Sequence, residues 1–416
     1  MSDWRTSLSA PTCPSTPLLS QISCYDPWSS SRLPDVQRNQ SEPISSREPP
    51  KTPPSKDEWT GGSRCAGEYC LYANRAFGGE RGIVVITTAH GLEKVKAIAG
   101  RAAAKTLEDE GDSHSSLPSG PSPFYVEEVS GKGLGMLASR ALRRGDVVLT
   151  RVPALLAHRN FMERTPREER ERLLGLVLSL LPAATRRSFV RQAGRFGGHE
   201  VADIVTTNSF QVDLGGDGTG SSAGHHYANF PEVSRFNHDC RPNAVFFVDA
   251  DLVHRTTVVR DVAPGEELTI SYLDSMAPRA ERQHRARVAW GFECTCAQCG
   301  LTDETAVAAS DGRLAEIAEL EGRLSDVKSE VTLDTVDRYV RLFAEEKLEA
   351  KLAGAYTTAA LNYNLLGKSG LAVKYARLAI EAGMIEDGPA APDVEAMRVL
   401  ARDPKKHFTW RARLGK

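Results

Sequence analysis

The sequence predicts an α+β protein, because two kinds of segment follow each other along the chain. From Phe124 onward, short strand-like segments rich in β-branched and aromatic residues alternate with glycine turns. From about Gly312 to the end, apolar residues recur at helical spacing. Between the two parts stands the short segment "CTCAQC" (294–299), whose cysteine spacing is typical of metal binding.

Composition limits the function classes. The 416 residues are 41% hydrophobic and 25% charged, as in ordinary soluble globular proteins, and their number predicts two or three domains. A formal net charge of -2 argues against a globally basic nucleic-acid binder, and we expect no sequence-specific nucleic-acid binding. No apolar run approaches the roughly 20 residues that a membrane helix needs. The N-terminus also lacks a continuous apolar segment, so we expect neither a membrane span nor a signal peptide.

The N-terminal part is predicted to be poor in structure. Residues 1–64 are rich in Pro, Ser and charge, and we expect them to be disordered. Residues 65–121 are predicted to be a small extension with a strand at 82–88, a following helix and a Gly/Ser/Pro linker. Cys65 and Cys70 in this extension are compatible with a local disulfide or with two free thiols.

The middle part, residues 122–273, carries most of the strand signals. A helix is predicted from an N-cap at Thr165, with proline at its first position, and the helical signal continues through 184–196. The predicted strands are 124–129, 147–152, 204–212 and 243–262, the last of them a hairpin.

The C-terminal part, residues 310–416, is predicted to be all helical. The spacing from Leu366 to Ala379 is compatible with one tetratricopeptide-type helix pair, and a plain helical bundle explains it equally well.

The cysteines at 294, 296 and 299 can bind one zinc ion from a single turn. Zinc prefers four ligands in a tetrahedron, so a structural site needs one further thiol. The candidates for the fourth ligand are Cys240, Cys65, Cys70, Cys13 and Cys24. The alternatives are a redox pair at Cys296 and Cys299, or free core thiols.

Two further motifs carry a weaker signal. The glycines of "GKGLG" (131–135) allow backbone to approach a ligand, although a tight turn explains them as well. The segment "GEELTISY" (265–272) predicts a turn and a short strand ending in Tyr272, which leads on toward the cysteines.

Taken together, these motifs resemble the SET-domain protein lysine methyltransferases with a cysteine-rich post-SET segment. The matching motifs, in order, are "GKGLG", "NSF", "RFNHDCRPN", "GEELTISY" and "WGFECTCAQC". The resemblance extends to the SET-and-MYND proteins and their fungal relatives, which also have a tetratricopeptide-like C-terminal region. This chain departs from that pattern because no Cys/His-rich MYND finger interrupts the SET segment.

The resemblance implies a β-rich SET fold of short strands and small sheets with inserted helices at 122–273, and a zinc-bound post-SET segment at 274–301. It implies that Asn237 and His238 contact S-adenosylmethionine and that Tyr272 is the catalytic tyrosine. Cys240 is the implied fourth ligand of a structural zinc ion, with Cys294, Cys296 and Cys299. The other implied cofactor contacts are Lys132, Gly133, Leu134, Gly135, Asn208, Tyr272 and Phe292.

The implied activity is methyl transfer from S-adenosylmethionine to a protein or peptide lysine, histone or non-histone. Two alternatives remain at this point: a catalytically silent SET-fold peptide-binding module, and a thiol redox protein using Cys296 and Cys299. We expect a nuclear or cytoplasmic location, and the C-terminal helices are candidates for a partner surface.

Overall fold

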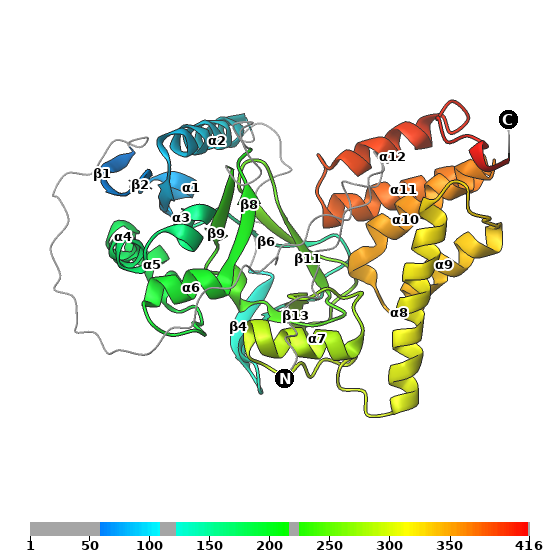
Figure 1. Ribbon diagram of the computed structural model, residues 1–416, viewed down its shortest axis with the longest axis horizontal. Coiled ribbons are helices and arrows are strands. Elements are labelled where there is room, and N and C mark those ends of the chain that lie inside the picture. Colours follow the sequence, from blue (N-terminus) through cyan, green and yellow to red (C-terminus); the bar gives the residue numbers. More distant parts are fainter. Residues whose placement is uncertain (1–58, 109–121, 216–223, 415–416) are drawn as a thin grey trace, which may run out of the picture.

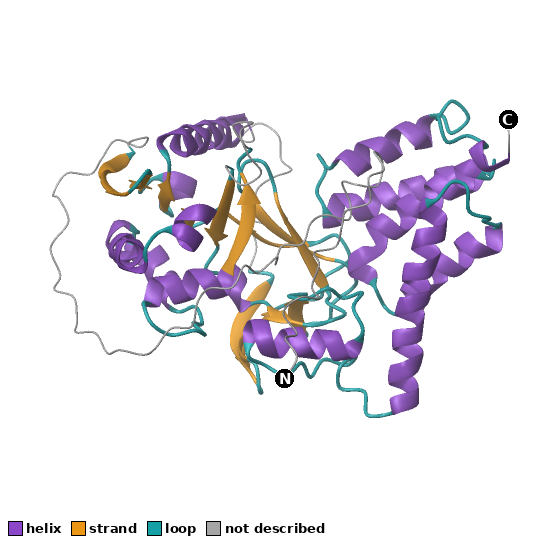
Figure 2. Ribbon diagram, viewed as in Figure 1, coloured by secondary structure: helices purple, strands orange, loops and turns teal. Residues whose placement is uncertain are grey.

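The computed structural model describes residues 59–108, 122–215 and 224–414, and these residues form an α+β fold, as predicted. Most of the segment predicted to be disordered lies outside them, as do most of the linker before residue 122 and both Cys13 and Cys24. The first described strand begins at Thr60, although the sequence predicts order only from Cys65; this strand is largely exposed and is held by pairing with its neighbour. Figures 1 and 2 show the strands gathered in one body and the C-terminal part built from helices alone.

The largest sheet has six strands in the order β1-β2-β3-β7-β9-β8. Their bounds are β1 Thr60–Ala66, β2 Tyr69–Asn74, β3 Ile83–Thr87, β7 Leu155–His158, β8 Ser209–Asp213 and β9 His225–Asn229. Every residue of β3 is buried, and β3 pairs in parallel with β7. The extension predicted at 65–121 therefore contributes strands to the sheet of the main body. Two helices belong to it, α1 Phe77–Glu80 and α2 Ala89–Glu108.

Two smaller sheets complete the body. One has the order β10-β13-β5-β4 and the other the order β11-β12-β6. Their bounds are β4 Phe124–Val129, β5 Gly133–Ala138, β6 Val147–Arg151, β10 Asn237–His238, β11 Ala244–Val248, β12 His254–Val258 and β13 Glu267–Ile270. The predicted hairpin at 243–262 is confirmed as β11 and β12, which pair antiparallel. Figure 1 shows these strands between the large sheet and the C-terminal helices.

The helices inserted in the body correct two sequence predictions. They are α3 Arg159–Arg164, α4 Arg167–Leu180, α5 Ala183–Val190 and α6 Glu200–Asn208. Thr165 is not the N-cap of α4: it ends α3 in an extended conformation, and Pro166 precedes α4. The predicted strand 204–212 is wrong in its first half, because Ile204 and Val205 face the core from α6. Their β-branched side chains favour a strand locally, but helix packing overrides this preference.

The C-terminal part has an apolar core of its own, built from different residues than the core of the body. Its helices are α8 Glu304–Ser325, α9 Leu333–Glu345, α10 Leu352–Leu365, α11 Ser369–Glu386 and α12 Pro392–Arg402. The segment before them contains α7 Arg279–Arg285 and a π-helical turn at Ala286–Trp290. The predicted helix pair around Leu366 is α10 and α11, which pack against each other. After α11, Gly388 at φ 93° lies so close to the body that a Cβ there would be 2.7 Å from the Phe247 ring.

Within the described residues, no helix is long and apolar enough to cross a membrane.

Candidate functional site

A short parallel pairing builds the centre of the site. Asn237 and His238 form strand β10, which lies beside Thr269 and Ile270 of β13. Tyr272 lies two residues after the end of β13, and its backbone N–H donates to His238 Nδ1 at 3.0 Å. Two segments that lie more than thirty residues apart in sequence thus bring their polar groups to one place.

Tyr272 lies in an aromatic cluster. Its ring centroid is 5.5 Å from that of His238, 5.7 Å from Trp290 and 6.3 Å from Phe292. The Tyr272 hydroxyl donates to the backbone carbonyl of Phe236. Burial, followed by the charge of Glu267, raises the pKa of Tyr272 above its usual value, so the hydroxyl stays protonated. Burial also lowers the pKa of His238 to about 4, which keeps its ring neutral.

The glycine turn (131–135) is connected to Asn237 through the carboxylate of Glu267. The Lys132 ammonium lies 2.6 Å from one Glu267 carboxylate oxygen, and the Asn237 amide donates to the other at 2.8 Å. At Gly135, an added Cβ would lie 3.0 Å from both the Asn237 amide nitrogen and Glu267 Oε1. The turn predicted to approach a ligand is therefore packed directly against the segment 235–243, which contains β10 and Cys240 and which we call the Asn-His loop.

This close approach predicts that Gly135→Ala is destabilising. The new methyl group would also lie 2.5 Å from Val129 Cγ2, and such overpacking costs about 1–3 kcal/mol. The free energy of unfolding in denaturant is the measurement. Gly312→Ala in α8 is the matched control, since a Cβ there meets nothing within 4 Å. Equal stability of the two variants would show that the turn and the loop do not pack as described.

Asn208 is a predicted cofactor contact whose side-chain hydrogen bonds are made outside the group around Tyr272. It is the last residue of α6, and its amide donates to the carbonyls of Ala193 at 2.7 Å and Ile204 at 2.9 Å. Neither partner belongs to the group around Tyr272, so the assignment of Asn208 to the cofactor stays a prediction.

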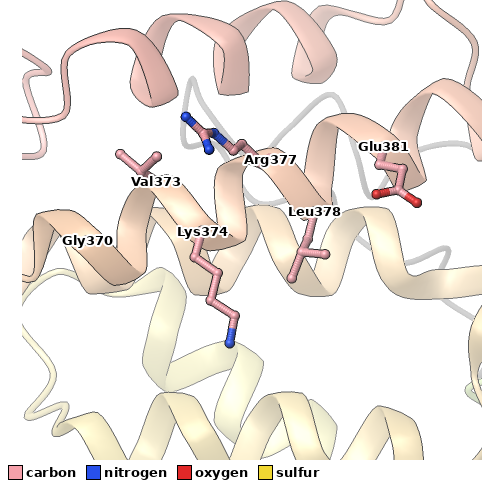
Figure 3. Close-up of a pocket in the computed structure, with 6 residues that line it drawn as sticks. All are labelled: Gly370, Val373, Lys374, Arg377, Leu378 and Glu381. Atoms are coloured by element: carbon pink, nitrogen blue, oxygen red, sulfur yellow. The ribbon is translucent and has the colours of Figure 1, made fainter.

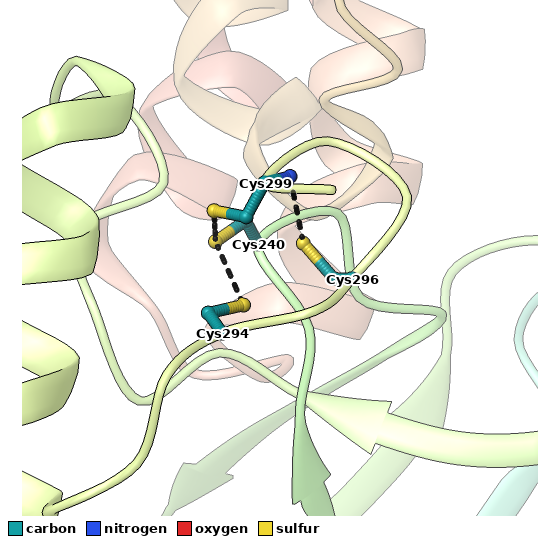
Figure 4. A group of neighbouring side chains, drawn as sticks. All are labelled: Cys240, Cys294, Cys296 and Cys299. Carbon is teal, nitrogen blue, oxygen red and sulfur yellow. Dashed lines mark hydrogen bonds between the residues drawn. The ribbon is translucent and has the colours of Figure 1, made fainter. Parts of the chain in front are cut away.

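The four cysteines implied as zinc ligands meet in one buried cluster (Figure 4). Cys240 comes from the loop after β10, and Cys294, Cys296 and Cys299 come from the post-SET segment. Their sulfur atoms all lie within 4.8 Å of one another. The Cys240 sulfur is 3.9 Å from that of Cys294 and 3.5 Å from that of Cys299.

The cluster fits a tetrahedral zinc ion. With Zn–S bonds of about 2.3 Å, the sulfur atoms of such a site lie about 3.8 Å apart. Arg282 gives a second indication: it is 1% exposed, and its Nε and Nη2 atoms have no hydrogen-bond partner in the described chain. Burial alone would lower the Arg282 pKa, but the neighbouring sulfur groups of Cys240 and Cys299 raise it above its usual value. A buried guanidinium is costly beside neutral thiols and would be balanced by an anionic zinc–thiolate centre.

Cys65 and Cys70 are excluded as ligands because they form a disulfide across β1 and β2. Of the two alternatives that the sequence left open for this pair, a local disulfide and two free thiols, the structure has the disulfide. The four clustered cysteines, in contrast, are all free thiols.

Sequence reasoning missed Glu267 and Arg282. The acidic turn before Tyr272 is visible in the sequence. Only the pairing of β13 with β5, which places Glu267 opposite Leu137, and the ion pair with Lys132 show that Glu267 lies beside the glycine turn. A surface hollow on α11 (Figure 3) contains none of the predicted site residues; it is lined by Gly370, Val373, Lys374, Arg377, Leu378 and Glu381.

Comparisons with known proteins agree with this geometry. Residues 133–273 match the SET domain family model. The chain is 35% identical over 125 residues to N-lysine methyltransferase SMYD2 of Homo sapiens, an alignment that covers 30% of this chain and 26% of that relative. It is 41% identical over 78 residues to histone-lysine N-methyltransferase SMYD3 of Homo sapiens, which covers 18% of each.

The matched segments thus span about a quarter or less of the length of these curated relatives. A solved structure of the SET domain of LSMT bound to lysine and AdoHcy also matches; the match covers 76% of this chain and 89% of the LSMT chain. Its sequence identity to this chain is 13% and its TM-score is 0.26. The chain contains a SET domain, as its motifs predict.

Proposed function

We propose that this protein is an S-adenosylmethionine-dependent protein-lysine N-methyltransferase. The observation that carries the proposal is the pairing of β10 with β13, which joins Asn237, His238 and Tyr272 inside a segment that matches the SET domain. The relatives named for lysine methylation match the same part of the chain and support it. The substrate is a lysine of a protein or peptide, histone or non-histone.

In this proposal the cofactor lies against the Asn-His loop, the glycine turn and Phe292. Asn237 and His238 supply polar contacts, Lys132, Gly133, Leu134 and Gly135 line the turn, and Asn208 contributes from the end of α6. When bound, S-adenosylmethionine would supply a methyl group on a positively charged sulfur. A neutral lysine amine takes this methyl group by in-line displacement: the N–C bond forms as the S–C bond breaks, the positive charge passes to the amine and S-adenosylhomocysteine leaves. No metal is needed for this step.

The chain's own residues would act mainly by alignment, which can contribute roughly 7–11 kcal/mol to a barrier. The Tyr272 hydroxyl, protonated and fixed by the Phe236 carbonyl, orients the reacting groups. The rings of Trp290 and Phe292 make an apolar surrounding that disfavours the charged form of the substrate lysine. We hold Tyr272 to be an orienting group and not a general base, because its raised pKa keeps the hydroxyl protonated, so that no tyrosinate is present to accept a proton.

We also propose that the four-cysteine cluster holds a structural zinc ion, which would tie the post-SET segment, and with it Phe292, to the cofactor loop. The proposed division of the chain follows: a SET domain at 122–273, a post-SET zinc segment at 274–301 and a helical region at 310–416. A nuclear or cytoplasmic location and a partner on the C-terminal helices stay predictions.

Titration of the purified protein with S-adenosylmethionine by calorimetry tests the proposed function. We expect saturable binding that Asn237→Ala weakens strongly. A catalytically silent peptide-binding module would bind a peptide without needing the cofactor, so a wild-type protein that does not bind it would refute the methyltransferase proposal.

Zinc binding makes a separate prediction for Arg282. Arg282→Met removes the buried charge next to the thiolates, and loss of such an outer partner costs about 10–100-fold in metal affinity. Zinc retained after dialysis against a chelator should fall accordingly. Arg285→Met is the control, because Arg285 is 47% exposed on the same helix and pairs with Glu281. Equal retention in both variants would mean that Arg282 does not balance a metal centre.

A further inference from the structure

A buried carboxylate links the C-terminal helices to the proposed active site. Glu346 directly follows α9, and its side chain is 1% exposed. Its Oε2 atom accepts hydrogen bonds from Arg241 at 2.8 Å and from the Ser310 hydroxyl at 2.9 Å. Its Oε1 atom accepts from Arg313 at 2.7 Å. Ser310 and Arg313 belong to α8, so the carboxylate joins both helices to a residue of the body.

Arg241 is the residue of the body that Glu346 binds, and it stands next to Cys240 in the Asn-His loop. All three of its guanidinium nitrogens are used. Nε donates to the Glu346 carbonyl at 2.6 Å, and Nη1 donates to the carbonyls of Cys240 at 2.8 Å and Ser275 at 3.0 Å. One side chain therefore connects the loop that carries a zinc ligand, the segment after Tyr272 and the C-terminal helices.

A second connection reaches the other zinc ligands. Gln298 lies between Cys296 and Cys299, and its amide donates to the Ser310 hydroxyl at 2.5 Å, which in turn donates to Glu346. Close by, the side chain of Arg279 donates to the Cys299 carbonyl at 2.9 Å, while its backbone N–H donates to Asp311 of α8 at 2.9 Å. Both halves of the four-cysteine cluster are thus tied to α8 and α9.

A buried ion pair adds little net stability compared with apolar packing, because removing the charges from water is costly. Its several hydrogen bonds of fixed geometry can instead hold segments in one arrangement. Here these segments are the Asn-His loop and the post-SET segment, which carry the proposed zinc ligands and cofactor residues. The function of the contact is therefore better sought in positioning than in stability.

We propose that Glu346 is a positioning residue: through Arg241, and through Ser310 and Gln298, it fixes the Asn-His loop and the post-SET segment relative to each other. The C-terminal helices are then a structural part of the cofactor site. For the cofactor this inference rests on the proposed function, and for the cysteine cluster it rests only on zinc binding.

The test uses the full-length protein with Glu346→Gln, Arg241→Met and the double variant. The control is Glu345→Gln, because Glu345 is the preceding residue and pairs on the helix surface with Arg338 at 3.0 Å. Two properties are measured: the Kd for S-adenosylmethionine, and the rate at which a chelator removes zinc. Methyl transfer at saturating cofactor is measured alongside, to separate binding from turnover.

We expect each single variant to raise the Kd and the zinc-release rate by about 10-fold or more, as loss of an outer-shell partner does. Turnover at saturating cofactor should change much less, and the control should match the wild type. Since both substitutions break the same link, the double variant should lose little more than the worse single variant.

The proposal is overturned if Glu346→Gln and Arg241→Met lower only the melting temperature and leave both the Kd and zinc release unchanged. Should Glu346→Gln fail to fold, Arg241→Met decides the question alone, because it leaves Glu346 bound to Arg313 and Ser310. A wild-type protein that retains zinc but does not bind the cofactor would refute the proposed function, whereas zinc release would still test the link through Glu346.

Discussion

Replacing Cys240 with serine is expected to remove the zinc ion and methyl transfer together. Among the described residues, Cys240 is the only cysteine of the cluster that comes from the body, and the other three sulfur atoms lie in the post-SET segment. Structural zinc contributes about 10–16 kcal/mol of apparent free energy in small zinc peptides. Here the loss should be local, because the body has its own core and stays folded. Without the zinc ion, Phe292 is no longer held beside Tyr272.

Metal analysis of purified protein checks this expectation, with one zinc ion per chain in the wild type and most of it lost in Cys240→Ser and in Cys296→Ser. Cys65→Ser is the matched control, because it breaks a disulfide in the β1–β2 hairpin but removes no thiol of the cluster. Wild-type protein that contains no zinc would contradict the account. Zinc that is lost in Cys65→Ser and kept in Cys240→Ser would contradict it too.

The second large effect is expected for Tyr272→Phe. The substitution keeps the ring in its contacts with His238, Trp290 and Phe292 but removes the hydroxyl that donates to the Phe236 carbonyl. We expect turnover to fall on the order of 10²-fold, the low end for a positioned polar group. The Kd for S-adenosylmethionine should change little.

Steady-state kinetics together with calorimetric titration separates these two quantities. A variant as active as the wild type would remove the Tyr272 hydroxyl from the mechanism. A variant that loses cofactor binding to the same extent as turnover would instead assign the hydroxyl to binding.

Much of the fold could be predicted from local sequence. The β11–β12 hairpin and the C-terminal helices follow from patterns that lie within single segments. The place of β3 could not be predicted, because its parallel partner β7 is about seventy residues away and nothing local specifies that pairing. In α6, the local sequence favours the wrong element: Ile204 and Val205 prefer a strand, but they are buried in a helix because tertiary packing overrides that preference.

Some residues of the candidate site could likewise be predicted from local sequence, and others could not. Motifs pointed to Tyr272, the Asn-His loop and all four cysteines, and the structure brings these together. Glu267, Arg282 and Glu346 were not predicted, because each acts through a partner on a distant element. Charged residues are common in any sequence, and only burial and contact geometry distinguish these three from solvent-exposed neighbours such as Glu345.

The most direct test of the central claim is the transfer of a labelled methyl group to lysine. Purified full-length protein is incubated with methyl-labelled S-adenosylmethionine and with core histones or a cell lysate, and the products are digested and analysed by mass spectrometry. The account predicts label on the ε-nitrogen of lysine with the wild type, strongly reduced label with Tyr272→Phe and none with Cys240→Ser. Label on another residue type, or a wild-type protein that binds the cofactor and methylates no lysine in either substrate, would contradict it.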